Sequence, residues 1–389
     1  MIRACFPRHS GVAYRGSLER AEMTAKQKLP AQPSADQCRS GQRSFAQYLS
    51  PMLFAIFTTP EQCEMAEVEI PVYSYAELKK ITNGFGAENF MGKTFSSNSL
   101  LYRGEIVDKE SNLVQKVIVE MRKNEKDYDL KVWQTQLNAL KDPTISSHPN
   151  VVKLQGYCNS ACDLGLVYDC HALGTLHSLI FDESFSWSMR MKVALQLARV
   201  LQFLHSQEKP LILLNFEPRS ILVDMDFNPL IFGFGLASGG VLGILDHTVL
   251  SLIFLSHPQV YLDPEYTLCG ITIGPWCDVF SFGTLLLAMI TKSHDPEVGE
   301  IIARSKYSFL QRFYGINFTK FIVLKNFWKD GKYHIRDSAA VTKLAVRCVK
   351  SCLTVVPKYH ERPGMSEAVS ILECLRVVKK LGLHCSSLA

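Results

Sequence analysis

The feature that most constrains this chain is a change in hydrophobic pattern near Gly174. Before that residue, apolar side chains come in short runs of strand length, separated by turn-forming stretches such as 108–112. After it, they recur at helical spacing over longer segments, and 279–290 is apolar on almost all sides, as in a buried helix. These two periodicities predict an α+β chain in which a small strand-rich lobe precedes a large helical lobe.

The predicted lobes meet around 167–174, with an N-lobe at about 73–167 and a C-lobe at about 168–380. Residues 1–66 mix Ser, Gln, Ala, Pro and Arg without lasting periodicity, which predicts a disordered N-terminal tail. The predicted strands are 100–106, 116–121, 151–157 and 164–168, and the predicted helices are 75–81, 128–140, 187–205, 276–291, 340–353 and 367–380.

Composition excludes several classes of protein. With 47% hydrophobic and 20% charged residues, the chain can bury a core and is not mainly disordered. The net charge of +5 gives no case for a nucleic-acid partner. The apolar run 52–57 is too short for a signal peptide or a transmembrane segment, and Ser281 and Gly283 interrupt the longer run. Twelve Cys without a CxxC pair predict reduced thiols, no metal site and a cytoplasmic protein.

Several short strings, in order along the chain, resemble landmarks of plant receptor-like protein kinases. The resemblance covers roughly 73–380 and implies a bilobal protein kinase-like fold. The strings are FMG (90–92), LYRG (101–104), HPNVVKLQGYC (148–158), LVYD (166–169), GTL (174–176), YLDPEY (261–266), CDVFSFG (277–283) and ERP (361–363).

Protein kinases hold ATP and transfer its phosphate with a small number of protein groups. The resemblance assigns each of these groups to a position in this chain. The glycine-rich loop, in which backbone N–H groups approach phosphate, retains only Gly92 over 92–99. Glu120 stands at the third-strand lysine position, where a carboxylate would repel phosphate, and Ile118 replaces the small alanine beside adenine. Cofactor binding at these three degenerate positions is therefore predicted to be lost.

A register shift of two residues would instead place Arg122 at the lysine position, and this alternative stays open. In either register the ion-pair partner is missing, because the helix after the third strand has no acid between Asp129 and Asp142.

The catalytic loop and the magnesium site have changed as well. By the resemblance, Asn215 replaces the aspartate base, and an amide cannot accept the substrate proton near neutral pH. Glu217 replaces a lysine that neutralises phosphate, Ser220 a metal-binding asparagine, and Gly233 the aspartate that anchors magnesium. These substitutions predict no catalytic residues, no metal, and no ATP or magnesium as cofactor.

Structural motifs remain. Glu265 and Arg362 match an ion pair that ties the end of the activation segment to the C-lobe, and Asp278 matches an aspartate that accepts backbone N–H groups of the catalytic loop. Leu213 and Phe234 keep apolar packing positions. The chain is therefore expected to be a folded kinase scaffold.

The activation segment, 233–265, has no Lys or Arg, and Leu214 replaces the arginine that would receive an activating phosphate. Its apolar run 250–255 either packs inward or docks a partner protein through Leu252, Ile253 and Phe254.

The pattern of losses resembles the zed-related kinases, receptor-like cytoplasmic pseudokinases similar to wall-associated receptor kinases. The resemblance implies an adaptor in plant immunity that bridges a nucleotide-binding leucine-rich-repeat receptor and cytoplasmic receptor-like kinases, with recruitment to the plasma membrane by partners left open. Two alternatives also stay open: a weak ATP-dependent serine/threonine kinase that uses Arg122, Glu217 or Asp224 in new roles, and a drifting gene copy without function.

Overall fold

The structure is a computed structural model that describes residues 70–94, 99–108, 110–126, 128–243, 260–264, 272–293, 325–350 and 361–383. The predicted tail, 1–66, lies outside these residues.

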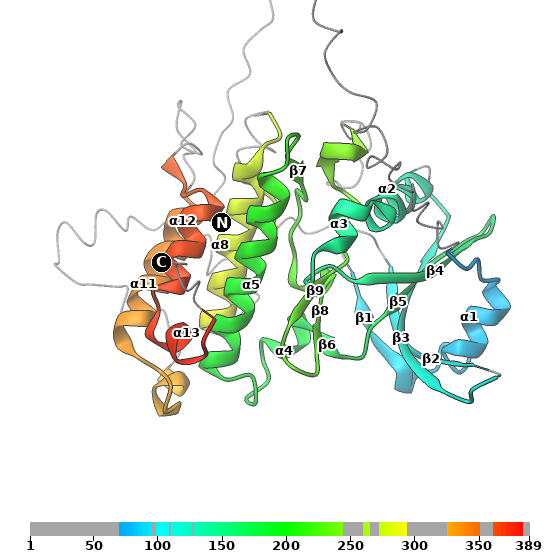
Figure 1. The fold of residues 1–389 in the computed structure, drawn as a ribbon, viewed down its shortest axis with the longest axis horizontal. Helices are drawn as coiled ribbons and strands as arrows, with labels where there is room; N and C mark the ends of the chain where they lie inside the picture. The colour runs from blue at the N-terminus through cyan, green and yellow to red at the C-terminus, as the bar shows by residue number, and fades with distance from the viewer. Residues whose placement is uncertain are drawn as a thin grey trace, which may run out of the picture. The chain divides into compact units, whose positions relative to one another are not determined.

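The N-terminal part is a five-stranded antiparallel sheet with the strand order β1-β2-β3-β5-β4 (Figure 1). Strands β1, β2 and β3 are neighbours in the order in which they follow in the sequence. Strand β5 then pairs with β3, and β4 pairs with β5 at the edge of the sheet. The strands are β1 (Phe90–Lys93), β2 (Leu100–Val107), β3 (Val114–Lys123), β4 (Lys153–Asn159) and β5 (Asp163–Asp169).

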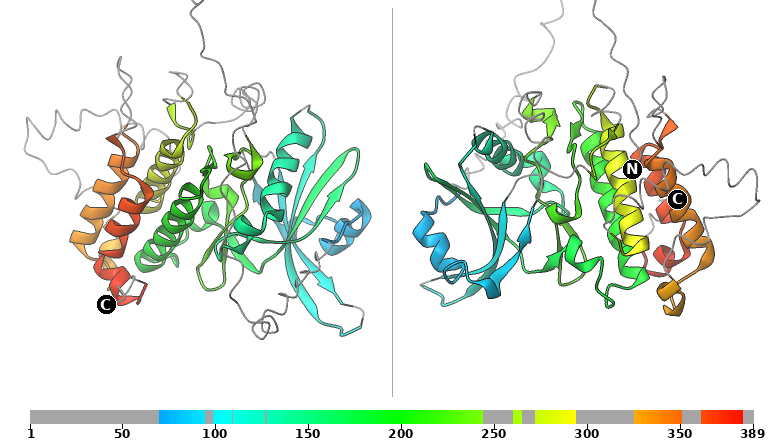
Figure 2. Two further views of the ribbon diagram at one scale, coloured as in Figure 1. Left: turned by 45° about the horizontal axis from the view of Figure 1, so that its top comes forward. Right: turned by 180° about the vertical axis from the view of Figure 1, so that it is seen from behind.

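Helices cover both faces of this sheet (Figure 2). Helix α1 (Tyr75–Ile81) begins with a capping box between Ser74 and Glu77 and packs Leu78 against one face. Helix α2 (Asp129–Lys141) packs Leu137 against the other face, next to Ile118. Because β3 is covered from both sides, its residues 117–122 are all buried, without the alternation of a half-exposed strand.

The C-terminal part is mainly helical and centres on α5 (Trp187–His205) and α8 (Pro275–Thr291), which contact each other. Every residue of α8 from Cys277 to Ile290 is buried. Among the described residues, this part also holds α4 (Leu176–Leu179), α11 (Ile335–Cys348), α12 (Met365–Glu373) and α13 (Arg376–Lys380), with 3-10 turns η2 (Pro218–Ser220), η3 (Gly240–Leu242) and η5 (Lys325–Lys329). The N-terminal part adds α3 (Pro143–Ser147) and the 3-10 turn η1 (Ala87–Asn89).

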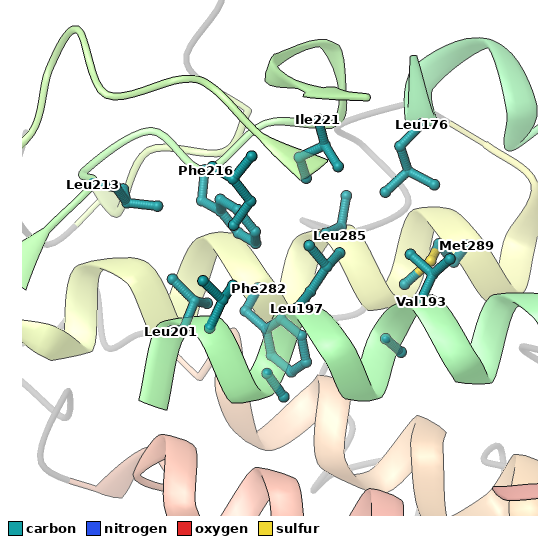
Figure 3. Packing of buried hydrophobic residues seen from close by; sticks show 14 of the residues in the cluster. Leu176, Val193, Leu197, Leu201, Leu213, Phe216, Ile221, Phe282, Leu285 and Met289 are labelled. Carbon is teal, nitrogen blue, oxygen red and sulfur yellow. The ribbon is translucent and has the colours of Figure 1, made fainter. Parts of the chain in front are cut away.

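Short strands carry the loops of the candidate site. These strands form a three-stranded sheet, β6-β8-β9, and a two-stranded one, β10-β7. They are β6 (Ala172–Thr175), β7 (Leu211–Ile212), β8 (Ile221–Asp224), β9 (Pro229–Ile231) and β10 (Ser238–Gly239). Figure 3 shows Leu213, Phe216 and Ile221 directed toward α5 and α8, so the loop between β7 and β8 rests on the buried helices.

The kinase-like fold expected from the sequence is confirmed, with corrections at three elements. The strand predicted at 151–157 is β4 and begins at Lys153, and α11 begins at Ile335 instead of residue 340. The single helix predicted at 367–380 is divided after Glu373, because the Asp337 carboxylate of α11 accepts the backbone N–H groups of Arg376 (3.1 Å) and Val377 (2.9 Å) and so starts α13. None of the described helices is long and apolar enough to span a bilayer.

Candidate functional site

The candidate site lies where β3 and α2 of the N-lobe meet the 213–220 segment and the 232–236 segment of the C-lobe. The predicted residues Glu120, Asn215, Glu217, Ser220 and Gly233 lie on these elements.

Glu120 of β3 is buried and bonded to two neighbours. Its Oε2 accepts a hydrogen bond from Gln136 Nε2 of α2 (2.7 Å) and another from the Tyr168 hydroxyl of β5. Gln136 Nε2 also donates to the Tyr168 oxygen (2.8 Å). Burial and the charge of Glu120 raise the pKa of Tyr168 well above its usual range, which keeps the hydroxyl protonated as a donor.

Gln136 was missed by the sequence reasoning, which looked only for an acid on this helix. The available signal was its spacing from Val132, one helical turn earlier, which places the amide on the buried face of α2. The structure thus has a carboxylate and an amide in contact where the resemblance led us to look for a lysine–glutamate ion pair.

Arg122 lies farther along β3 and contacts the first residue of α2. Its Nη1 lies 3.7 Å from Asp129 Oδ1 and donates to the Asp129 carbonyl at 3.3 Å, and its Nε donates to Ser99 Oγ at 3.4 Å. Burial lowers the pKa of the Arg122 guanidinium, and the charges of Glu120 and Asp129 act in the opposite direction. Glu120, therefore, and not Arg122, is the β3 side chain that meets the middle of α2.

Two other predicted positions lie near the strands. Gly92 in β1 has a φ of 139°, a conformation that side-chain-bearing residues rarely adopt, and open space where a Cβ would lie. The next part of that loop, 95–98, is outside the described residues. Ile118 is buried in the core on the α2 face of the sheet.

The 213–220 segment is anchored by Asp278 of α8. This fully buried carboxylate accepts the backbone N–H groups of Leu213 (2.9 Å) and Leu214 (2.8 Å) and lies 2.9 Å from His205 Nε2. Leu214 has a φ of 67°, an unfavourable left-handed conformation for leucine that costs about 1–2 kcal/mol and is held by these bonds. The role that the resemblance gave to Asp278 is present in the geometry.

Side chains of the same segment bind one another. Asn215 is partly exposed, whereas Glu217 is buried and accepts a hydrogen bond from Ser220 Oγ at 3.3 Å. Arg219 Nη1 donates to the Lys93 carbonyl of β1 at 3.3 Å. Burial lowers the pKa of Arg219, and the charge of Glu217 opposes that effect.

Asp224, which a residual kinase would need in a new role, serves the turn between β8 and β9. Its Oδ1 accepts the backbone N–H groups of Asp226 (2.9 Å) and Asn228 (2.7 Å), and its Oδ2 accepts from Asn228 Nδ2 (2.9 Å). This pattern is that of an Asx-type turn.

Gly233 lies directly against Ser220. A Cβ built on Gly233 would be 2.4 Å from Ser220 Cβ and 2.9 Å from its Oγ, closer than atoms can approach without movement. The backbone is fixed there because Phe232 and Phe234 are both fully buried and Phe232 N–H donates to the Ser220 carbonyl (3.3 Å).

These contacts test whether magnesium fits the positions that the resemblance assigns to it. Ser220 and Gly233 supply one neutral hydroxyl and no carboxylate, and that hydroxyl donates to Glu217. Magnesium prefers carboxylate oxygens in an open octahedral arrangement, so the two positions do not fit the metal. Among the described residues, no group of three or more His, Cys, Asp or Glu side chains could hold a metal ion.

Arg362 binds a carboxylate that sequence reasoning did not select. Its Nη1 and Nη2 bind the two carboxylate oxygens of Asp263, the latter at 3.0 Å, and its Nη1 and Nε also donate to the carbonyls of Trp276 and Lys350, both at 2.9 Å. Both side chains of the pair are buried. The predicted partner Glu265 and the predicted docking residues Leu252, Ile253 and Phe254 lie outside the described residues.

Comparison with known proteins identifies the family. Residues 95–372 match the family described as protein tyrosine and serine/threonine kinase. An EPD1-interacting receptor-like cytoplasmic serine/threonine-protein kinase of Nicotiana benthamiana is 32% identical over 307 residues, which cover 78% of this chain and 63% of that protein. A putative receptor-like protein kinase of Arabidopsis thaliana is 31% identical, with 81% and 68% covered, and the probable serine/threonine-protein kinase PBL2 of the same plant is 30% identical, with 82% and 73% covered.

The chain therefore spans less than two thirds of the length of the Nicotiana relative. With its five-stranded sheet followed by helices and its match over 95–372, this chain belongs to the protein kinase family and is a distant relative of the plant receptor-like cytoplasmic serine/threonine kinases.

Proposed function

We propose that this chain is a catalytically inactive pseudokinase that binds neither ATP nor magnesium. The close approach of Gly233 to Ser220 carries the proposal, because no metal-binding side chain fits at position 233 unless the backbone moves. The carboxylate of Glu120 adds to it, since it is bound to Gln136 and Tyr168 at the position of a phosphate-binding lysine.

The residues that a weak or atypical kinase would recruit already bind neighbours. Arg122 pairs with Asp129, Glu217 accepts from Ser220, and Asp224 supports a turn. Recruiting any of them for phosphoryl transfer would break these contacts, which makes the inactive form the better-supported proposal.

The adaptor role rests on the retained scaffold and on the resemblance to zed-related kinases. Asp278 holds the 213–220 segment, and Arg362 binds the buried Asp263 carboxylate. In this proposal the domain presents a folded surface that bridges a nucleotide-binding leucine-rich-repeat immune receptor and cytoplasmic receptor-like kinases. It works in the cytoplasm and reaches the plasma membrane through its partners.

Nucleotide binding can be tested by thermal unfolding with and without millimolar ATP and magnesium. A ligand at 100 times its Kd stabilises a protein by about 2.7 kcal/mol, a rise in Tm of about 4 °C for a domain of about 300 residues. We expect no magnesium-dependent rise, while an active receptor-like cytoplasmic kinase run beside it should show one. A clear rise for this chain would refute the inactive form.

The adaptor role needs a separate experiment. Tagged chain expressed in leaf tissue should co-purify with a nucleotide-binding leucine-rich-repeat receptor and with cytoplasmic receptor-like kinases. Chain that accumulates as stable protein without either class of partner would contradict the adaptor proposal.

A further inference from the structure

We infer that helix α2 is clamped in one position by bonds that require neither nucleotide nor phosphate, so the domain presents a constitutive conformation. The α2 clamp consists of Asp129, Val132 and Gln136 on α2 and their contacts on β3, β5, the 213–220 segment and the 232–236 segment. The inference deepens the proposed function and rests on it for one point, that nucleotide does not position the helix.

The position of this helix matters because, in active kinases, its movement controls whether the catalytic ion pair forms. Activity requires an ion pair between a third-strand lysine and a glutamate of this helix, and phosphorylation of the activation loop controls whether the pair forms. A ligand or modification can shift such an equilibrium only if it contacts the two states differently.

The polar part of the clamp is buried. Gln136 donates to Glu120 at 2.7 Å and to Tyr168 at 2.8 Å, and all three side chains are excluded from solvent. If α2 moved away, the Glu120 carboxylate would lose its amide donor and the Gln136 amide would lose both of its acceptors, which is costly. At the start of the helix, the buried pair of Asp129 and Arg122 adds a second attachment.

The apolar part of the clamp joins α2 to the C-lobe. Val132 and Tyr128 lie in one buried cluster with Leu214, Leu236, Ile212 and Cys277. Leu214 stands where an arginine would bind an activating phosphate, so apolar packing takes the place of a phosphate-dependent contact. Gly235 shows how close the approach is, because a Cβ built there would lie 2.6 Å from Val132 Cγ1.

The three clamp residues of α2 lie on the same face of the helix. Asp129, Val132 and Gln136 are three, four and seven residues apart and therefore lie along one face of the helix. Their contacts reach both lobes, so a shift of α2 would have to break the polar and the apolar contacts together. A partner that contacts α2 would accordingly meet this helix in the same position at any nucleotide concentration and in any phosphorylation state.

Hydrogen exchange with mass spectrometry on the full chain tests the clamp. In ligand-free protein, amides of α2 should exchange as slowly as those of the buried helix α5, and millimolar ATP–Mg should not change either rate. Gln136→Ala should speed exchange across α2 by roughly tenfold to a hundredfold, the effect of one buried group left unsatisfied, while α5 is unchanged. The matched control is Gln134→Ala, the same change on the exposed face of the same helix, which should have no effect.

A second pair of variants covers the case in which Gln136→Ala does not fold. Gln136→Glu alone places two buried carboxylates in contact and should speed exchange of α2, whereas Glu120→Lys combined with Gln136→Glu creates an attractive pair and should restore slow exchange.

The outcomes separate the clamp from the proposed function, and the wild-type chain suffices to distinguish them. Fast α2 exchange that ATP–Mg does not alter overturns the clamp alone. Slow α2 exchange combined with a magnesium-dependent rise in Tm overturns the inactive form alone. Fast exchange that ATP–Mg slows overturns both.

Discussion

Replacing Gly233 with alanine should destabilise the domain, although alanine is the smallest side chain that can be added. The new Cβ would lie 2.4 Å from Ser220 Cβ, whereas two carbon atoms pack at about 3.5–4.0 Å, so one backbone must move by about 1 Å. The neighbouring Phe232 and Phe234 are fully buried and resist that movement. Overpacking of this kind costs about 1–3 kcal/mol, which for a domain of about 300 residues corresponds to a fall in Tm of about 2–5 °C.

A double-mutant cycle tests this explanation with circular-dichroism melting of four proteins. Ser220→Gly removes the atoms that the new methyl group would meet, so the fall in Tm caused by Gly233→Ala should largely disappear in the Ser220→Gly background. The cycle also cancels the separate costs of losing the Ser220 hydroxyl and of adding a glycine. If Gly233→Ala melts like the wild type, or if its effect is the same in both backgrounds, the two positions are not in contact and the metal argument fails.

Three further predictions concern the same scaffold. Arg362→Ala should cost about 3–5 kcal/mol because it leaves the Asp263 carboxylate buried without its cation, whereas Asn215→Ala should barely change the unfolding midpoint, and equal small effects would contradict the structural role. Asn215→Asp or Gly233→Asp alone should leave phosphotransfer at background in a radiolabelled ATP assay, and autophosphorylation by either variant would show that the site has been misread. Phe254→Ala should abolish capture of partners with little change in Tm, while a loss of about 3–5 kcal/mol would instead place Phe254 in the core.

Much of the fold could be predicted because burial leaves a periodic record in the sequence. Helix α8 is apolar around almost its whole circumference and is buried from Cys277 to Ile290, and α5 has the bounds that its spacing predicts. The division between α12 and α13 could not be predicted in the same way. It depends on the Asp337 carboxylate of α11, which is distant in sequence and reaches the start of α13 only in the folded chain.

At the candidate site, the positions that depart from the kinase motifs were visible in the sequence, but the partners of their side chains were not. Glu120 could be recognised by its place in a strand motif, since a motif is local. Its partners Gln136 and Tyr168 come from two other elements, and an amide and a phenol carry no signal of pairing with an acid. Asp263 was missed for a similar reason, because the motif directed attention to Glu265, two residues later.

Gln136 and Tyr168 both donate hydrogen bonds to the buried Glu120 carboxylate. A buried carboxylate introduced at position 120 would destabilise the domain unless donors met it, because an unpaired buried charge is costly. Gln136 and Tyr168 supply those donors, and Arg122 contributes a nearby positive charge. Glu120 therefore links β3 to β5 and α2 through hydrogen bonds that need no nucleotide. In the proposed inactive form, the carboxylate that would repel phosphate also holds α2, so Glu120→Ala would loosen α2 without creating a phosphate-binding cation.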